Sequence, residues 1–593
     1  MQDLAQTISR QLLPCIQQPS QYIGRETNAR GNDVHTAELT VAMAFPDAYT
    51  IGISHLGSQL LYHQLNAIPG VACDRTYCPA TDVEAVMRDQ QIPLFGWESR
   101  CALGDFDVIG FSLPYELCVT NVLTMLDLAG IPLRAADRSD SDPIILGGDA
   151  LADSPEPLAP FIDVFIAGDG EGPLAQLAEV TKRAKAEQLA REDTLLRIAQ
   201  TVDGAYVPRF YDSLVTADGA FAGLAPVRED VPFPIHRAAV DALADTPIPH
   251  APLVPLAEGV HERIIIEVMR GCPNGCRFCQ AGATRLPVRS RPVQQIIDAI
   301  AAAIATTGYR EVSLLSLSTS DYPHLEELIS QINEAFAPQH VSISLPSLRV
   351  DSQLKQLPRL TGAVRKGGLT IAAEAGSERL RKAIRKRLTE EDMLAGVRAA
   401  YEAGWHRVKV YFMVGLPGET PDDIDAIFHL CKRLSDTSKE INGQPGSISA
   451  SVSWAVPKPH TPMQWSPMQT ADYFGTVRQR LRDLSGRSAI NFKFHDLRRS
   501  LLEGMLARGD RRMGDLIEAA WRDGARMDSW DENFSPIPWQ DARNASPVDT
   551  DALIHGPIAL DAPLPWDHIV CHRSREFLER EYAEMMSVID EVD

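Results

Sequence analysis

Apolar runs alternate with amphipathic segments in two long regions of the chain. In the first region, residues 106–113, 143–148 and 163–172 have the short apolar runs of buried strands, and residues 120–130 have helical spacing. Buried strands that alternate with helices pair in parallel, so the pattern predicts a doubly wound, Rossmann-like α/β sheet. Such sheets bind ligands beyond the carboxyl ends of their strands. Glycines stand at these ends: Gly147, Gly148, Gly168, Gly170 and Gly172.

The second region repeats the strand-and-helix pattern six times. Its expected strands are residues 263–269, 311–317, 341–346, 368–374, 407–415 and 447–456. Six strands with intervening helices predict a partial (β/α)6 barrel of the TIM type, with its site at the carboxyl ends of the strands.

The same pattern divides the chain into four parts. We expect an N-terminal segment with the Rossmann-like domain over 1–180, a proline-rich connector over 181–255, the barrel over 256–460, and a mostly helical accessory domain over 461–593. A chain of 593 residues is too long for one hydrophobic core, which agrees with this division.

Charge and hydropathy narrow the class of protein. The formal net charge of -22 argues against broad neutralisation of nucleic-acid phosphates, although a local basic patch keeps a nucleic-acid partner open. No apolar run approaches the roughly 20 residues that span a bilayer, and the first residues lack the layout of a signal peptide. We therefore expect a cytoplasmic protein with no membrane partner.

Three cysteines follow the first barrel strand directly. Cys272, Cys276 and Cys279 form a CxxxCxxC loop, and a reducing compartment disfavours a disulfide between them. Structural zinc normally takes four ligands, and no second cysteine pair is nearby. Three thiolates can instead hold three irons of a cubane and leave the fourth iron open for another ligand. The loop therefore predicts an iron–sulfur cluster at the active end of the barrel.

The loop, with Phe278 before its last cysteine, resembles the radical S-adenosylmethionine (SAM) superfamily. This resemblance implies that the three cysteines hold a 4Fe-4S cluster and that SAM binds its open iron. One electron from an external donor, such as flavodoxin or ferredoxin, then cleaves SAM to a 5'-deoxyadenosyl radical.

Two further segments of the barrel share the resemblance. Residues 371–386 are similar to the segment in which a glutamate, here Glu374, contacts SAM; the alternative is that Glu374 caps the next helix. Residues 411–420 are similar to the fifth strand of the methylthiotransferase-like branch, where glycines let the backbone approach the adenosine. Gly415 and Gly418 hold these positions, and an ordinary turn is the alternative.

One segment departs from the family pattern. Residues 314–322 stand where many relatives have Gly-Gly-Glu to hold the methionine amino group. Ser316, Ser318 and Thr319 are the candidate replacements in this chain.

The first α/β region resembles the cobalamin-binding domain that precedes many radical SAM barrels. The resemblance implies that Gly147, Gly148, Gly168 and Gly170 accommodate the corrin and its nucleotide tail; a flavodoxin-like or degenerate domain is the alternative. The usual DxHxxG motif is absent. His55, after the apparent first strand, is the candidate lower ligand, and an exposed loop histidine is the alternative reading.

Over its whole length the chain resembles an uncharacterised branch of cobalamin-binding radical SAM proteins. This implies a cobalamin-dependent methyltransferase acting on an unactivated carbon. The alternatives are a cobalamin-linked radical cyclase or rearrangement enzyme, a tRNA- or protein-modifying enzyme, and a non-catalytic binding module. No substrate or catalytic residue is assigned. His460, Trp465 and His568 are candidates for the substrate end of the barrel, with packed turns as the alternative.

Overall fold

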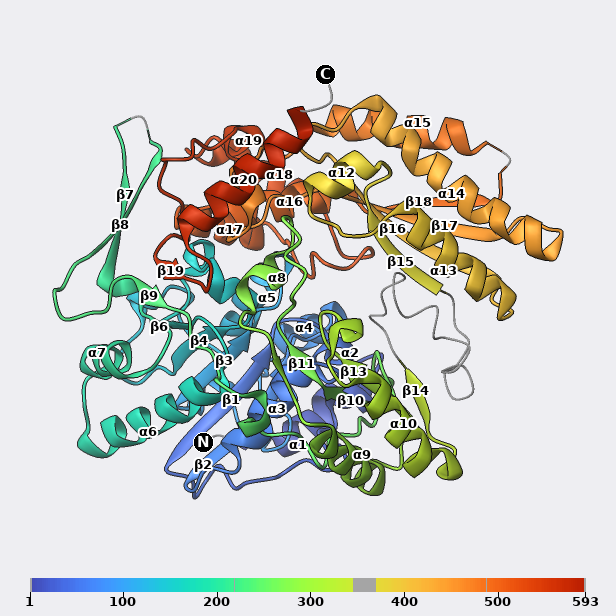
Figure 1. Cartoon of the computed structure of the whole chain (residues 1–593). Helices are drawn as coiled ribbons and strands as arrows, with labels where there is room; N and C mark the ends of the chain where they lie inside the picture. The colour runs from blue at the N-terminus through green and yellow to red at the C-terminus, as the bar shows by residue number, and fades with distance from the viewer. Residues whose placement is uncertain (1–2, 218, 345–368, 487, 591–593) are drawn as a thin grey trace.

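A six-stranded sheet forms the N-terminal part of the computed structural model, which describes residues 3–217, 219–344, 369–486 and 488–590 (Figure 1). Its strands are parallel apart from β6, which runs antiparallel to β5. In sheet order they are β2 (Val71–Tyr77), β1 (Leu39–Phe45), β3 (Val108–Ser112), β4 (Ile144–Gly148), β5 (Val164–Ile166) and β6 (Ala205–Tyr206). The expected doubly wound sheet is thus confirmed, and its order reverses between β1 and β3.

Strand β2 was not among the expected strands because its sequence is not continuously apolar. All seven of its residues are buried, including Arg75. The Arg75 guanidinium pairs with Glu26 at 2.9 Å and with Glu98 at 2.8 Å. These ion pairs satisfy a charge that local periodicity would place at the surface.

The barrel strands form two parallel sheets in the described residues. The first contains β10 (Ile264–Glu267), β13 (Glu311–Leu315) and β14 (Ser342–Ser344); the second contains β15 (Leu369–Glu374), β16 (Arg407–Val414), β17 (Ser447–Trp454) and β18 (Ile490–Phe494). The six expected barrel strands are present, although residues 345–346 of the third and residue 368 of the fourth lie outside the described residues. Strand β18 adds a seventh that was not expected.

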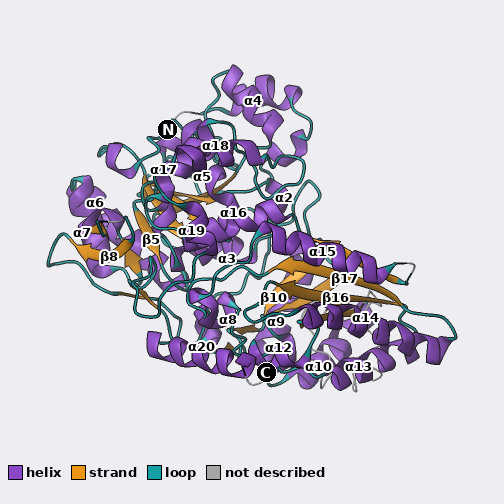
Figure 2. Cartoon of the chain, turned by 90° about the horizontal axis from the view of Figure 1, so that it is seen from above, coloured by secondary structure: helices purple, strands orange, loops and turns teal. Residues whose placement is uncertain are grey.

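Helices cover one face of each barrel sheet. Helices α9 (Val293–Thr307) and α10 (Leu325–Phe336) pack on the first sheet, and α13 (Glu390–Glu402), α14 (Pro421–Asn442) and α15 (Ala471–Ser485) pack on the second. Figure 2 shows the second sheet at one end of the molecule and β5 at the other, with α8 (Gln280–Thr284) between them.

The C-terminal region is mostly helical, as expected, and it packs on both preceding domains. Helix α17 (Met513–Arg522) packs on α5 (Val119–Leu128), where the Trp521 indole donates to the Thr124 hydroxyl at 3.0 Å. The last helix, α20 (Arg575–Asp590), lies beside α12 (Glu378–Ala383) of the barrel (Figure 1).

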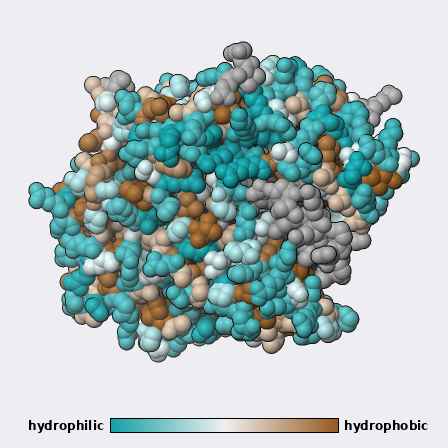
Figure 3. Space-filling model, in the orientation of Figure 1, coloured by the Kyte–Doolittle hydropathy of each residue, from teal (hydrophilic) through white to brown (hydrophobic). Residues whose placement is uncertain are grey.

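The surface shows no extended apolar region on the face drawn in Figure 3, where brown residues form small separate patches. Within the described ranges, no helix has both the length and the apolar character needed to cross a bilayer.

Candidate active site

The cysteine loop lies between β11 (Met269–Arg270) and α8, and backbone contacts fix its shape. Gly271 has a φ of +83°, and a Cβ there would lie 2.8 Å from the carbonyl oxygen of Arg285. Cys279 caps α8 because its sulfur accepts the Gly282 N–H at 3.3 Å. A residue with a side chain at position 271 would therefore displace the loop.

The three thiols are close enough for the charge of one to change the pKa of another. They are half-buried. Burial raises the pKa of Cys276 to about 11, Lys386 opposes this shift, and the charges of Cys279 and Cys272 add to it. Three thiolates that repel one another fit a cationic cluster, whose irons compensate their charge.

The donor set also suits a cluster better than a single ion. Among the residues that the structure describes, no three His, Cys, Asp or Glu side chains are grouped as one metal ion requires. A cubane binds each thiolate on a different iron and needs no such convergence.

Glu374 ends β15 and faces the cysteine loop. Its charge raises the pKa of Cys276, and its carboxylate lies 3.4 Å from the Lys386 ammonium. Burial raises the pKa of Glu374 itself. Ser377, rather than Glu374, caps α12, because the Ser377 hydroxyl accepts the Leu380 N–H at 3.2 Å. The structure therefore disfavours the capping alternative, while contact of Glu374 with SAM stays a prediction.

The loop after β13 is tied to the cysteine loop through two residues that sequence reasoning missed. The Asn274 amide donates to the Cys272 sulfur at 3.3 Å and to Asp321 at 2.8 Å. Asp321 also accepts the Ser318 hydroxyl at 2.6 Å. Ser316 lies 3.1 Å from the Thr319 hydroxyl. Ser318 is thus linked to the cysteine loop through Asp321 and Asn274, while contact of Ser316, Ser318 and Thr319 with SAM stays a prediction.

Gly415 has a structural reason to be glycine. Its φ is +90°, and a Cβ would lie 2.6 Å from the Phe474 ring. Its N–H donates to the two carboxylate oxygens of Glu419 at 2.6 and 3.0 Å. Gly418, at a φ of +64°, likewise meets Ile589 of α20. The turn alone accounts for both glycines, and approach of an adenosine to Gly415 stays a prediction.

A cavity of about 670 Å³ lies between the two α/β domains. The carboxyl ends of β1, β3 and β4 form one wall, and the face of β10 and β13 turned away from α9 and α10 forms the other. Gly148, Gly168, Gly170 and Ser316 line it. Gly147 does not, because the Leu113 and Phe165 side chains occupy the space of its Cβ at 2.9 and 3.0 Å. Gly147 therefore has a packing role, and the expectation that it accommodates a ligand is wrong.

His55 also lines this cavity but serves as a helix cap. Its Nδ1 accepts the Ser58 N–H at 3.2 Å and so caps α3 (Leu56–Leu65). Its Nε2 lies 3.6 Å from Asp149, which pairs with Arg285 at 2.6 Å. Burial lowers the pKa of His55, which favours the neutral ring. Because Nδ1 accepts a hydrogen bond, the neutral ring carries its proton on Nε2, and the geometry does not offer a lone pair to a metal.

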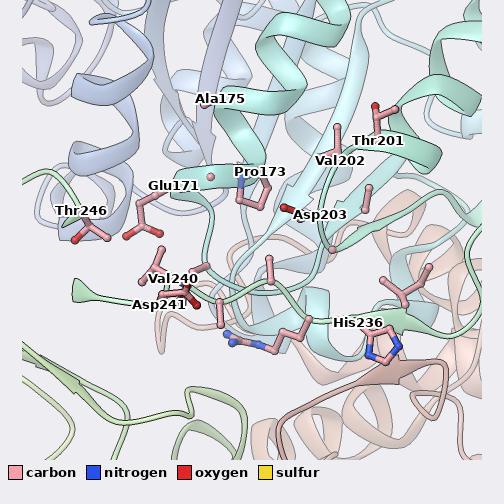
Figure 4. A pocket seen from close by; sticks show the side chains of 18 of the residues that line it. Glu171, Pro173, Ala175, Thr201, Val202, Asp203, His236, Val240, Asp241 and Thr246 are labelled. Carbon is pink, nitrogen blue, oxygen red and sulfur yellow. Dashed lines mark hydrogen bonds between the residues drawn. The ribbon is translucent and has the colours of Figure 1, made fainter. Parts of the chain in front are cut away.

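A second cavity, of about 890 Å³, adjoins the first (Figure 4). Asp169 and Glu171 line both cavities. Arg270, the residue before Gly271, pairs with Glu171 at 2.7 Å and with Glu267 at 2.9 Å. The strand that enters the cysteine loop is thereby anchored to the N-terminal domain.

The three aromatic candidates for the substrate end of the barrel have packing partners elsewhere. His460 Nε2 lies 2.6 Å from the Asp153 carbonyl, and the His568 ring lies 4.5 Å from the Tyr206 ring, tilted by 52°. Trp465 is 1% exposed and packs against Tyr582. None of the three lines either cavity, so packed turns account for them.

Two family descriptions match the chain. Residues 266–431 match the radical SAM superfamily, and residues 57–208 match the N-terminal domain of radical SAM proteins. The first match contains the three cysteines, Glu374 and Gly415. The chain is therefore a radical SAM enzyme, and its expected cofactors include a 4Fe-4S cluster and SAM.

Several known proteins are similar to this chain over part of its length. The uncharacterised protein MJ0966 of Methanocaldococcus jannaschii is 25% identical over 485 residues, which cover 81% of this chain and 90% of that one. A tRNA-2-methylthio-N(6)-dimethylallyladenosine synthase of Sorangium cellulosum is 28% identical over 28% of this chain and 38% of its own length. The radical SAM methyltransferase TsrM of Kitasatospora setae, solved with cobalamin and a 4Fe-4S cluster, aligns with a TM-score of 0.49 at 16% identity, over 72% of this chain and 77% of that one.

Proposed function

We propose that this radical SAM enzyme is a cobalamin-dependent methyltransferase that acts on an unactivated carbon. The observation that carries the proposal is the 670 Å³ cavity, which joins the carboxyl edge of the doubly wound sheet to the face of β10 and β13 beside the cysteine loop. Ligands of doubly wound sheets bind at such an edge, and the volume is in the range of cofactor sites.

The residues around the cavity leave room for a large cofactor and offer apolar contact area to a corrin ring. A Cβ at Gly148 would find only the Phe111 carbonyl oxygen, at 4.0 Å, so the glycine leaves room for a ligand. Leu60, Leu146, Ile166 and Leu174 supply apolar contact area. When bound, the cluster and SAM supply the substrate radical and cobalamin supplies the methyl group.

The chain's own residues hold and orient these groups. Cys272, Cys276 and Cys279 would hold the cluster, and Ser316 and Glu374 would contact SAM from the ends of two strands. An external one-electron donor such as flavodoxin or ferredoxin would supply the electron that reduces the cluster for SAM cleavage.

Corrinoid binding tests the cofactor assignment. The full chain, expressed with hydroxocobalamin, should copurify with a corrinoid absorbance, and Gly148→Leu should lose it because the new side chain enters the cavity. Gly172→Leu is the matched control, since nothing lies within 4 Å of its Cβ and it lines only the second cavity. Absence of a corrinoid from the wild type, or equal binding by Gly148→Leu, would contradict the assignment.

The product's mass separates the alternatives. A methyltransferase adds the mass of one methylene group to the substrate, whereas a radical cyclase or rearrangement enzyme adds none. The similarity of the barrel to the tRNA-modifying synthase favours a second candidate, modification of tRNA. Nucleoside analysis of tRNA from a deletion strain would reveal a missing modified base if that candidate is right.

A further inference from the structure

One face of the second barrel sheet carries cationic and hydroxyl side chains in a regular array. The helices α13, α14 and α15 cover the opposite face, where Val408, Val410 and Phe412 are buried. Because side chains alternate along a strand, Arg407, Lys409 and Tyr411 of β16 stand on the uncovered face. Strand β17 presents serines there at every second position: Ser447, Ser449, Ser451 and Ser453.

The register places two lysines around these serines. Lys409 of β16 is opposite Ser449, and Lys493 of β18 is opposite Ser451. Ser449 also faces Asn491 across the β17–β18 pair. Lysine ammonium, serine hydroxyl and asparagine amide groups are all hydrogen-bond donors. This face therefore presents donors from three adjacent strands.

The cations on this face have no acidic partners among the residues that the structure describes. Arg407, Lys409 and Lys493 are exposed, and within the described ranges none of them forms an ion pair. The Lys409 ammonium lies 4.5 Å over the Tyr411 ring. The whole chain has 79 acidic and 57 basic residues, so cations left unpaired by carboxylates indicate an anionic ligand.

Ser451 is a further candidate contact for a ligand on this face. It is only 8% exposed, and it stands between the other two strands of this face. Its hydroxyl can donate a hydrogen bond to a ligand oxygen there. Its neighbours on the sheet are Tyr411 and Lys493.

We infer that this face binds the phosphate group of the substrate, an inference that rests on the proposed function. Lys409 and Lys493 stand two strands apart, or about 10 Å between strand axes, which suits an anion with several oxygens more than one carboxylate. Lysine binds phosphate as a mobile point charge. Thr370, the β15 residue opposite Lys409, precedes Glu374 by four residues, or about 13 Å along the strand. The phosphate would thus anchor the substrate at a distance from the SAM end of the barrel.

Titration calorimetry of the full chain with inorganic pyrophosphate tests the inference. The wild type should bind, and Lys409→Gln combined with Lys493→Gln should weaken binding at least tenfold. Ser451→Ala should weaken it about fivefold while keeping both charges. Lys432→Gln is the matched control, because Lys432 is an exposed lysine on α14 that pairs with Asp436.

The outcomes separate this inference from the proposed function. Failure of the wild type to bind pyrophosphate, or equal binding by the double lysine variant, would overturn the phosphate site. Pyrophosphate binding needs neither cluster nor cobalamin, so a wild type that binds it but forms no 5'-deoxyadenosine would contradict the proposed function and support the anion site.

Discussion

Arg277 and Glu581 are 304 positions apart in the chain, yet the Arg277 Nε donates to the Glu581 carboxylate at 3.0 Å. Both side chains are 6% exposed. Arg277 stands between Cys276 and Phe278 in the cysteine loop, and Glu581 belongs to the last helix. Glu581 also pairs with Arg385 at 2.7 Å. Helix α20 therefore holds the cysteine loop against the barrel.

Removing this carboxylate should destabilise the protein strongly. We expect Glu581→Ala to lower the free energy of unfolding by about 3 kcal/mol, because it removes the buried partner of Arg277 and leaves only the exposed Glu584 to pair with that charge. Denaturant unfolding measures the loss. Glu584→Ala is the control: Glu584 also pairs with Arg277 but is 56% exposed, so its loss should cost less than about 1 kcal/mol. Equal losses of unfolding free energy in the two variants would contradict the role of Glu581 in holding the cysteine loop.

Gly415 should be intolerant of a side chain for reasons of packing. We expect Gly415→Ala to lower the free energy of unfolding by more than about 2 kcal/mol, since the methyl group meets the Phe474 ring and the φ of +90° is strained. Gly443 also has a positive φ, of +72°, but nothing lies within 4 Å of its Cβ. Gly443→Ala should therefore cost only about 1 kcal/mol. A larger loss at Gly443 than at Gly415 would refute the packing argument.

Glu419 should make stability depend on pH. Burial raises the pKa of Glu419 to about 8. Because the folded state favours the protonated carboxyl, unfolding releases a proton between pH ~5 and pH ~8. The free energy of unfolding should therefore fall as the pH rises through this window, by up to about 1.4 kcal/mol per pH unit. Glu419→Gln should flatten the slope measured by denaturant unfolding at several pH values, and an unchanged slope would rule out this carboxyl as its source.

The fold was predictable where strands are continuously apolar. Strands β3, β4 and β5 have such runs, whereas β16 and β17 of the barrel alternate between apolar and polar residues, and all of them are present. Strand β2 was missed because its buried Arg75 is neutralised by Glu26 and Glu98 from distant parts of the chain. Strand β18 also alternates, with Asn491 and Lys493 between its three apolar residues, but it is only five residues long and lies in a region that is otherwise mostly helical.

The site was predictable where spacing encodes chemistry. The interval between the three cysteines indicated the cluster loop, and residues 371–386 indicated Glu374, whose contact with SAM stays a prediction. Contacts between distant segments left no such signal, as with Asn274 and Asp321 or with Arg277 and Glu581. Gly147 was assigned to the ligand site because it stands, like Gly148, at the carboxyl end of a strand, but the strand turns successive residues to opposite faces.

Iron and sulfide analysis of the anaerobically reconstituted full chain tests the central claim most directly. We expect about four irons and four sulfides per chain, together with reductant-dependent formation of 5'-deoxyadenosine from SAM. Replacement of Cys272, Cys276 and Cys279 by alanine should abolish both. Stoichiometric zinc in place of iron, or 5'-deoxyadenosine formation that survives the triple replacement, would contradict it.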